Sequence, residues 1–121
     1  MKKVDFSEHI PANTVDTEGA KGAKMRVLIG PDDHAPTFAM RQFEIEPGGC
    51  TPSHEHPWEH EMYFLQGSAD VQIGDAVHPM RPGCFAFVPP NEPHQVRNTG
   101  HILLKFLCLI PVSQPCGCPV K

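Results

Sequence analysis

Apolar residues along this chain fall into short runs that alternate with polar residues and stop at glycine or proline. The run at 25–29 is Met-Arg-Val-Leu-Ile and stops at Gly30-Pro31, and the run at 37–45 stops at Pro47-Gly48-Gly49. Short runs rich in β-branched and aromatic residues, bounded by turn residues, predict β-strands. Both segments are therefore expected to be strands.

Five more segments downstream have the same character and are again separated by turn residues. They are 60–66, 70–73, 84–88, 94–98 and 101–110. Gly67-Ser68 stands between the first two, so these are expected to pair as a hairpin. Strands that recur every ~8–12 residues between turns are typical of a sandwich or barrel. The pattern therefore predicts an all-β, antiparallel domain.

The last of these segments places Lys105 among residues that are largely apolar. Because side chains alternate between the two faces of a strand, turning Lys105 toward water assigns every other position to a face. The positions expected to point inward are Ile102, Leu104, Phe106, Cys108 and Ile110. Those left on the side of Lys105 are Leu103, Leu107 and Leu109. An apolar outer face needs a cover, and a second copy of the chain is the simplest one, so we expect a homodimer.

The length of the chain indicates one domain, and its prolines and glycines indicate that this domain has few helices. A chain of 121 residues has the usual size of a single domain. Its 14 prolines and 10 glycines leave little room for helices of ordinary length. We divide the chain into an N-terminal arm at 1–24, a barrel domain at 25–111 and a C-terminal tail at 112–121.

Charge and hydropathy argue against several classes of partner. The formal net charge is −4 and the 10 basic residues form no run, so nucleic acid is not an expected partner. The longest apolar stretch, 102–111, is interrupted by Lys105 and is shorter than the ~20 residues that span a bilayer, so no membrane partner is expected. An acidic, polar stretch follows the lysines at the start, where a secretion signal would be apolar, and this favours a cytoplasmic protein.

The cysteines do not indicate a disulfide framework. There are five of them, which is an odd number in a chain without an export signal, so reduced thiols are expected. Cys116 and Cys118 flank one glycine near the end of the chain. They could chelate a metal or oxidise, but two thiols on a proline-flanked tail are more simply explained as part of a flexible end.

Four of the eight histidines fall in two short segments of the chain. His54 and His56 flank Glu55, and residues two apart in an extended chain project to the same face, so both imidazoles can reach one point. His60 follows four residues later, and His94 lies in a separate segment. A lone histidine is best explained as a hydrogen-bonded core or surface residue, so the case for a metal depends on the arrangement of all four.

The first of these segments resembles the first conserved motif of the cupin superfamily. That motif is Gly, five residues, His-x-His, three or four residues, Glu, six residues and Gly. This chain has Gly48, His54, His56, His60 and Gly67 at those positions. It departs from the motif at His60, where the family carries glutamate.

The second segment resembles the second cupin motif, which is Gly, five residues, Pro-x-Gly, two residues, His, three residues and Asn. Here the matching residues are Gly83, Pro89, Asn91, His94 and Asn98. Asn91 replaces a glycine. Apart from glycine itself, asparagine is the residue that best tolerates a positive φ. Two long motifs in the right order make a chance match improbable.

This resemblance implies a double-stranded β-helix, the jelly-roll barrel of the cupins, over about residues 25–111. The chain is most similar to small one-domain cupins that share His-Pro-Trp-Glu-His-Glu and Phe-Leu-Cys-Leu-Ile-Pro. In that subgroup the metal, often manganese, sits on four histidines. The resemblance therefore implies one divalent transition metal, manganese first, on His54, His56, His60 and His94.

Two points about this site stay open at the level of sequence. Glu59 and Glu61 adjoin His60, so a carboxylate could replace it as third ligand; otherwise both would hydrogen-bond ligand imidazoles or face solvent. Imidazole suits Zn, Cu, Fe and Ni alike, so the donor set does not identify the metal.

Four residues are candidates for the cavity beside the metal. Phe106 and Cys108 should point into the barrel, where Cys108 is more simply a small buried apolar residue than a catalytic thiol. Arg41 shares the parity of Phe43, so a regular strand would turn it inward to anchor a substrate carboxylate, whereas a bulge would turn it to solvent or an ion pair. Trp58 could form a pocket wall or a dimer contact, with packing as the simpler role.

Four neutral imidazoles leave a divalent ion with its full charge, which favours anionic or enolisable small molecules such as carboxylates and diketones. Two cis positions of an octahedral ion stay open for a chelating substrate or for substrate and dioxygen together. The leading hypothesis is a dioxygenase-type oxidoreductase for a small chelating substrate, because no side chain in the pattern is an obvious general base. A non-catalytic binding protein for a carboxylate or sugar acid is the alternative from another class, and a metal-dependent isomerase or lyase is the third.

Overall fold

The computed structural model describes residues 2–113, which form nine β-strands and two short 3-10 helices. In chain order the elements are η1 (Ser7–His9), β1 (Asn13–Thr14), β2 (Lys21–Ile29), η2 (Pro31–Asp33), β3 (Phe38–Cys50), β4 (His60–Gln66), β5 (Ala69–Ile73), β6 (Ala76–Met80), β7 (Phe85–Val88), β8 (His94–Asn98) and β9 (Leu104–Pro111). All pairings between them are antiparallel. The all-β prediction is confirmed.

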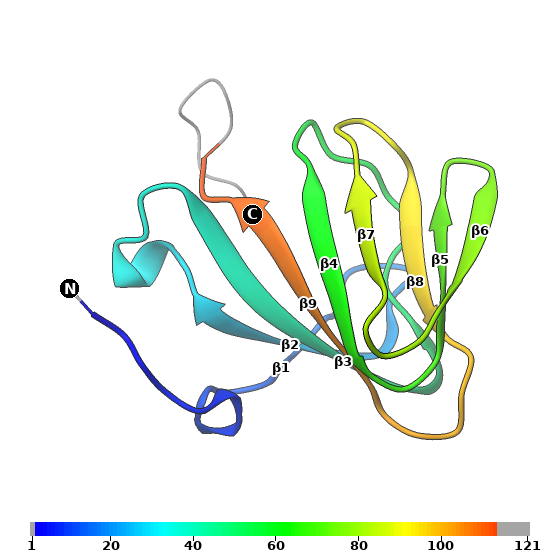
Figure 1. The fold of residues 1–121 in the computed structure, drawn as a ribbon, viewed down its shortest axis with the longest axis horizontal. Helices are drawn as coiled ribbons and strands as arrows, with labels where there is room; N and C mark the ends of the chain where they lie inside the picture. The colour runs from blue at the N-terminus through cyan, green and yellow to red at the C-terminus, as the bar shows by residue number, and fades with distance from the viewer. Residues whose placement is uncertain (1, 114–121) are drawn as a thin grey trace.

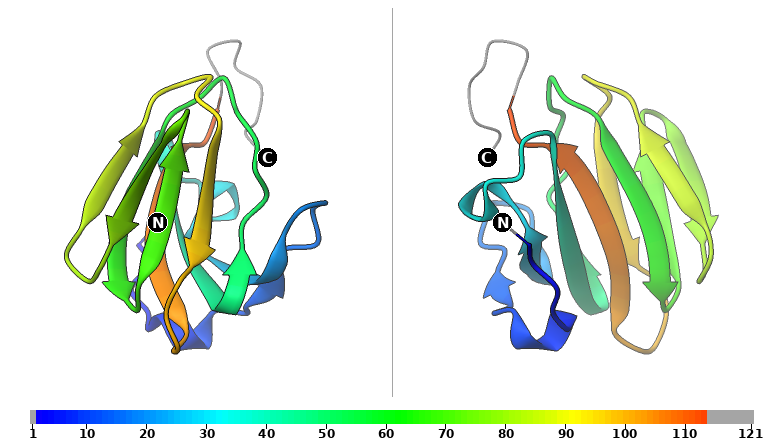
Figure 2. Two further views of the ribbon diagram at one scale, coloured as in Figure 1. Left: turned by 90° about the vertical axis from the view of Figure 1, so that its right-hand side faces the viewer. Right: turned by 60° about the vertical axis from the view of Figure 1, so that its left-hand side comes forward.

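The strands form one strongly curved sheet that closes around a single interior (Figures 1 and 2). The order of the main path is β6-β5-β8-β3-β9-β4-β7, and β2 pairs with β3 on a side branch. The 13-residue strand β3 connects the two halves, since it pairs with β9 along 38–45 and with β8 only at Cys50. This nearly closed antiparallel barrel is the predicted jelly roll.

Strand β3 continues past the point where the sequence was expected to end it. The predicted stop at Pro47-Gly48-Gly49 is instead a bend within the strand, which runs on to Cys50. Gly48 adopts a positive φ of 79°. A Cβ on Gly49 would come 2.4 Å from the Lys21 carbonyl oxygen of β2. The glycines therefore turn the strand through a tight corner instead of ending it.

The hairpin predicted around Gly67-Ser68 is wrong. Strand β4 pairs with β7 and β9, whereas β5 pairs with β6 and β8, so the two strands belong to different halves of the barrel. Gly67, with a φ of 86°, lies close to the backbone of Leu103 and Leu104 and carries the chain from one half to the other. Strand β6 was not predicted, because its largely exposed residues carry no apolar alternation.

The last strand confirms the faces that Lys105 predicted. Buried and half-buried positions alternate along β9, with Leu104, Phe106, Cys108 and Ile110 on the buried side. Ile102 does not follow the prediction: it is 57% exposed, because it precedes the start of the strand. Burying a large aliphatic or aromatic side chain contributes ~1.5–3 kcal/mol, so this inner row is a main part of the core.

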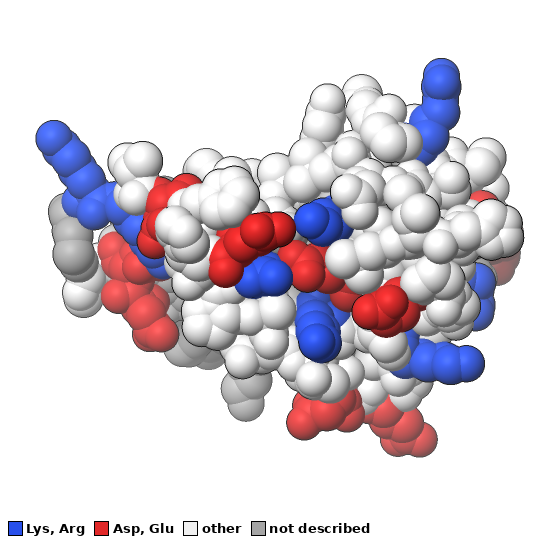
Figure 3. Space-filling model, turned by 90° about the horizontal axis from the view of Figure 1, so that it is seen from below, with Lys and Arg blue, Asp and Glu red and all other residues white. Residues whose placement is uncertain are grey.

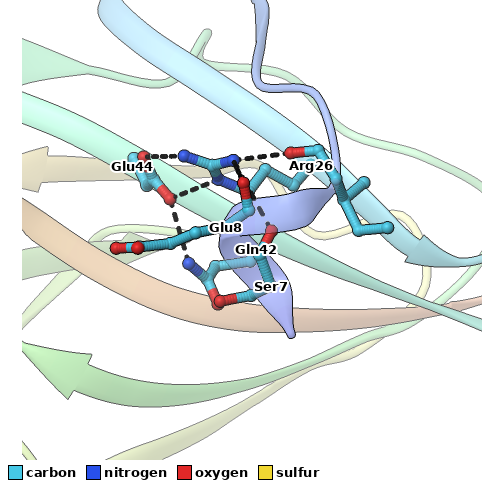
Figure 4. A network of polar contacts seen from close by, with 6 residues as sticks. Ser7, Glu8, Arg26, Gln42 and Glu44 are labelled. Atoms are coloured by element: carbon cyan, nitrogen blue, oxygen red, sulfur yellow. Dashed lines mark hydrogen bonds and ion pairs between the residues drawn. The ribbon is translucent and has the colours of Figure 1, made fainter. Parts of the chain in front are cut away.

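The N-terminal segment packs against the barrel. β1 pairs with β2 in the register Asn13↔Met25. Arg26 of β2 then donates hydrogen bonds to the carboxylate of Glu44 at 2.7 Å and 3.4 Å and to the Ile10 carbonyl at 2.5 Å (Figure 4). One guanidinium therefore ties the segment around η1 to both β2 and β3.

One face of the molecule carries mixed charge (Figure 3), and the cysteines that the structure describes form no disulfide. On the face drawn in Figure 3, acidic and basic side chains are interspersed. Within residues 2–113, no helix is long and apolar enough to cross a membrane. Cys50, Cys84 and Cys108 form no disulfide, while Cys116 and Cys118 lie outside the described residues.

Candidate metal centre

Three separate segments bring four histidines to the inside of the barrel. His54 and His56 lie between β3 and β4, while His60 and His94 are the first residues of β4 and β8. His54 and His94 form an isolated β-bridge with backbone hydrogen bonds of 3.3 Å and 3.0 Å. This bridge fixes the loop that carries the His-x-His pair against β8.

The four imidazoles lie close together. Possible ligand nitrogens of His54, His56 and His94 all lie within 4.8 Å of one another, and the Nε2 atoms of His54 and His56 are 3.2 Å apart. The His60 ring centroid is 4.6 Å from that of His94 and 5.3 Å from that of His56. A cluster of this kind can hold a metal ion, and the ligand atoms of His54, His56 and His94 are close enough to do so without rearrangement.

Two of the rings are oriented by contacts at Nδ1. His94 Nδ1 lies 3.0 Å from the Glu92 carbonyl oxygen, which accepts a hydrogen bond from it. His60 Nδ1 lies 3.3 Å from Cys108 Sγ. In both rings this contact leaves Nε2 free to act as a metal ligand. Histidines that bind a metal through one ring nitrogen commonly form a hydrogen bond through the other. His60 Nε2 is buried and has no hydrogen-bond partner in the described part of the chain.

The surroundings favour the neutral form of three imidazoles. Burial lowers the pKa of His54, lowers that of His56 to about 4 and lowers that of His60 to about 3, with the neighbouring histidines and Arg41 adding to the effect. A metal ligand must offer an unprotonated nitrogen. These rings therefore offer unprotonated nitrogens at neutral pH.

The carboxylates beside His60 face away from this cluster. Glu59 and Glu61 are exposed, and Glu61 lies opposite Phe87 and Leu109 in the register, on the outer face of the sheet. Partial desolvation and a hydrogen bond with Glu59 raise the pKa of Glu61 to about 7. Side chains alternate between the two faces of a strand, so His60, next to Glu61, turns inward and is 5% exposed.

A cavity of about 290 Å³ adjoins the histidines. Of the sequence candidates, Arg41, Phe106 and Cys108 line it together with the four histidines. Trp58 is not among the lining residues; its ring stacks on His56 with centroids 4.5 Å apart and planes 6° apart. Trp58 therefore packs behind a ligand candidate.

Sequence reasoning missed one wall of this cavity. Residues 13–17 of the N-terminal segment line it beside Met25 and Pro52. Nothing in their own sequence marks them, because they reach the cavity only through the pairing of β1 with β2. The N-terminal segment therefore belongs to the site as well as to the fold.

Arg41 is the only one of these candidates with a permanent charge. It is half-buried, and its Nη2 lies 3.2 Å from Cys108 Sγ and its Nη1 3.6 Å from Met25 Sδ. The guanidinium carbon lies 5.1 Å from the Phe43 ring centroid. The regular parity of β3 is therefore kept at this position, and the side chain turns inward.

Comparison with known proteins agrees with the fold and with the motifs. The family model described as a cupin domain matches residues 41–110. The structure of the polyketide cyclase RemF from Streptomyces resistomycificus superimposes with a TM-score of 0.87 at 34% identity, covering 100% of this chain and 87% of that one.

Two sequence relatives extend this comparison. The oxalate-binding protein of Thermotoga maritima is 28% identical over 110 residues, covering 88% of this chain and 91% of the relative. Protein SchB of Streptomyces halstedii is 31% identical over 84 residues, which are 68% of this chain and 61% of SchB. The matching proteins therefore include a cyclase and a binding protein on one architecture.

Proposed function

The chain belongs to the cupin family, whose members share a barrel but not a reaction, and we propose that it binds one divalent transition metal on His54, His56, His60 and His94 and uses it to bind a small chelating molecule. The observation that carries this proposal is the convergence of four imidazoles from three segments on one cavity. Fold alone would not support it, because function depends on the site.

The residues fit such an ion. Nitrogen donors are suitable for Zn, Cu, Fe and Ni, and the resemblance adds manganese as the first candidate. His60 Nε2 is buried and has no hydrogen-bond partner within residues 2–113, which is costly for a polar atom, and a metal ion would supply that partner. Cys108 and the Glu92 carbonyl hold two of the rings in the orientation that ligation requires.

When bound, a divalent ion would polarise the oxygen atoms of a chelating ligand as a Lewis acid. The chain's own contribution is to hold four neutral donors, so that the ion keeps its charge, and to surround the ligand with apolar walls. Phe43 and Phe106 stack with ring centroids 5.1 Å apart and form part of the cavity lining. These walls would exclude water and orient a planar substrate.

Two reactions are consistent with such a site. The similarity to RemF favours a cyclisation or isomerisation in which a carbonyl substrate is polarised and no oxidant is consumed. A dioxygenase-type reaction would need a substrate and O₂ at neighbouring positions of the ion. The similarity to the oxalate-binding protein supports the non-catalytic alternative, in which the metal only captures a small carboxylate.

Elemental analysis and an oxygen electrode test these proposals. The purified protein should contain about one metal ion per chain, and the His54→Ala/His94→Ala double variant should lose it, with His101→Ala as the matched control outside the cavity. O₂ consumption with diketones or catechols would support the dioxygenase; binding and turnover without O₂ uptake would support the cyclase type. Retention of stoichiometric metal by the double variant would contradict the metal site.

We also propose that the outer face of β4, β7 and β9 forms a homodimer contact. Tyr63, Phe85 and Phe87 are 46%, 77% and 55% exposed, and Tyr63 lies opposite both Phe85 and Leu107 in the register. A contiguous apolar face of this kind usually marks an interface. Phe85→Lys/Phe87→Lys should shift the protein from dimer to monomer in sedimentation, and a monomeric wild type would contradict the proposal.

A further inference from the structure

Arg41 places a positive charge inside the barrel, and no acidic residue of the described chain pairs with it. It lies near the start of β3, directly opposite Cys108 of β9, and both side chains turn to the interior. None of the ion pairs formed by residues 2–113 includes Arg41. Withdrawing a charge from water is costly without an opposite charge nearby, so this half-buried guanidinium lacks the counter-charge that its position favours.

The hydrogen bonds that Arg41 makes are weak. Its Nη atoms point to the thiol sulfur of Cys108 and the thioether sulfur of Met25, and both are poor acceptors. Its Nε atom is buried and has no partner among the described residues. The planar fork of a guanidinium binds a carboxylate with two charge-assisted hydrogen bonds, which are much stronger than contacts to sulfur.

This guanidinium lies next to the candidate metal centre. Cys108 Sγ is 3.2 Å from Arg41 Nη2 and 3.3 Å from His60 Nδ1, so a single sulfur atom separates the charge from a ligand imidazole. The same cavity is lined by Arg41 and all four histidines. A ligand bound to the metal would therefore extend toward Arg41.

The rest of the lining defines the body of the ligand. Asp16 is the single acidic residue among the described lining residues, and it is exposed at the cavity. The lining includes polar residues of the N-terminal segment and Thr51, but six apolar side chains also contribute to it: Val15, Met25, Phe43, Met62, Val96 and Phe106. At about 290 Å³ the space lies near the lower end of the ~300–1,000 Å³ that is usual for small-molecule sites.

We infer that the ligand of this cavity is a small planar carboxylate that chelates the metal through oxygen atoms at one end and is bound by Arg41 through its carboxylate at the other. The inference rests on the proposed metal site and names the class of molecule that this site takes. The ligand's carboxylate would supply the negative charge that Arg41 lacks as a partner. The aromatic walls would hold the flat, apolar body of the ligand.

Calorimetric titration under anaerobic conditions tests this inference with two matched probes. One is protocatechuate, a catechol whose carboxylate lies across the ring from the chelating oxygens, and the other is its neutral carboxamide. Both can chelate the metal, and only the first offers a charge to Arg41. The full-length, manganese-loaded protein should bind the acid at least 10-fold more tightly than the amide, since hydrogen bonds to a charged group are worth about 10- to 100-fold in affinity.

Variants separate the charge of Arg41 from charge in general. Arg41→Gln should abolish the preference for the acid and leave binding of the amide unchanged. Arg97→Gln, which removes an equal charge from an exposed position on β8, should keep the preference. If Arg41→Gln does not fold by circular dichroism, Arg41→Lys keeps the charge without the fork and should show an intermediate preference.

The outcomes distinguish this inference from the metal proposal. Equal affinity of the wild type for acid and amide, failure to bind the acid, or an equal loss of both probes in Arg41→Gln would overturn the Arg41 site. If one of these results is found and the amide still binds only to metal-loaded protein, the metal site remains supported. Absence of stoichiometric metal in the wild type would refute the metal site and the two-ended ligand together.

Discussion

Replacing Glu44 by glutamine removes one charge from the ion pair that fixes the N-terminal segment. Glu44 Oε2 accepts hydrogen bonds from Arg26 Nε at 2.7 Å and from Gln42 Nε2 at 3.0 Å. The two charged side chains are only 16% and 10% exposed, so solvent screens the pair weakly. Breaking a buried pair costs ~3–5 kcal/mol. Since backbone carbonyls such as that of Ile10 still accept from the guanidinium, we expect a loss of about 2–3 kcal/mol of unfolding free energy.

The cost of this substitution should depend on pH in a defined direction. The hydrogen bond from Arg26 and a further one from Gln42 hold the pKa of Glu44 below its ordinary value of 4.5. A carboxyl group with a lower pKa in the folded state stabilises the protein fully above its unfolded pKa, and this stability is lost as the pH falls through the folded pKa. The difference between wild type and Glu44→Gln should therefore be largest at neutral pH and shrink below pH 4.5.

Urea unfolding of the metal-free protein, at fixed concentration and at pH 7 and pH 3.5, measures this difference. Circular dichroism reports the β-sheet, and a chelator keeps metal binding out of the free energy. Glu46→Gln, two residues along the same strand but exposed and outside the ion pairs described, is the matched control and should change stability by less than ~0.5 kcal/mol. A Glu44→Gln variant as stable as this control at pH 7, or a loss that does not change with pH, would refute the reasoning.

Three further substitutions test the fold by the same unfolding measurement. Gly49→Ala would place a Cβ 2.4 Å from the Lys21 carbonyl oxygen, so β2 and β3 must separate locally, and we expect a loss of ~1–3 kcal/mol; an unchanged midpoint would contradict the tight corner. Asn98→Ala removes a 3%-exposed amide that donates to the carbonyls of Ile45 and Ile102, and leaving these acceptors unsatisfied should cost ~2–4 kcal/mol; a loss below 1 kcal/mol would count against that role. Phe64→Ala empties a fully buried core position and should cost ~3–5 kcal/mol, whereas a cost near that of a surface change would contradict the described core.

The sequence predicted most strands because their inner faces are continuous and apolar. Alternation around Lys105 identified four of the residues that β9 buries, and the segment 94–98 coincides with β8. The predictions that were wrong concerned the course of the backbone and not the pattern of side chains. Gly67 and Gly49 were read as turn and stop signals, but they act as corners between halves of the barrel, and only the packing of distant strands decides between these roles.

The candidate site was also predicted in part. Motif spacing marked the four histidines, and the structure brings them to one cavity, with His60 turned in and its two neighbouring glutamates turned out. The contacts of Arg41 with Cys108 and Met25 could not be read from the chain, because β2, β3 and β9 meet there only after folding. The wall formed by residues 13–17 was invisible for the same reason.

An anomalous diffraction map of crystals grown with manganese tests the central claim most directly. We expect one strong peak at bonding distance, roughly 2.0–2.3 Å, from a ring nitrogen of each of His54, His56, His60 and His94. Open positions of the ion should face the cavity that contains Arg41. A peak bound by Glu59 or Glu61 in place of His60, or a cavity without any anomalous peak at full manganese loading, would contradict the account.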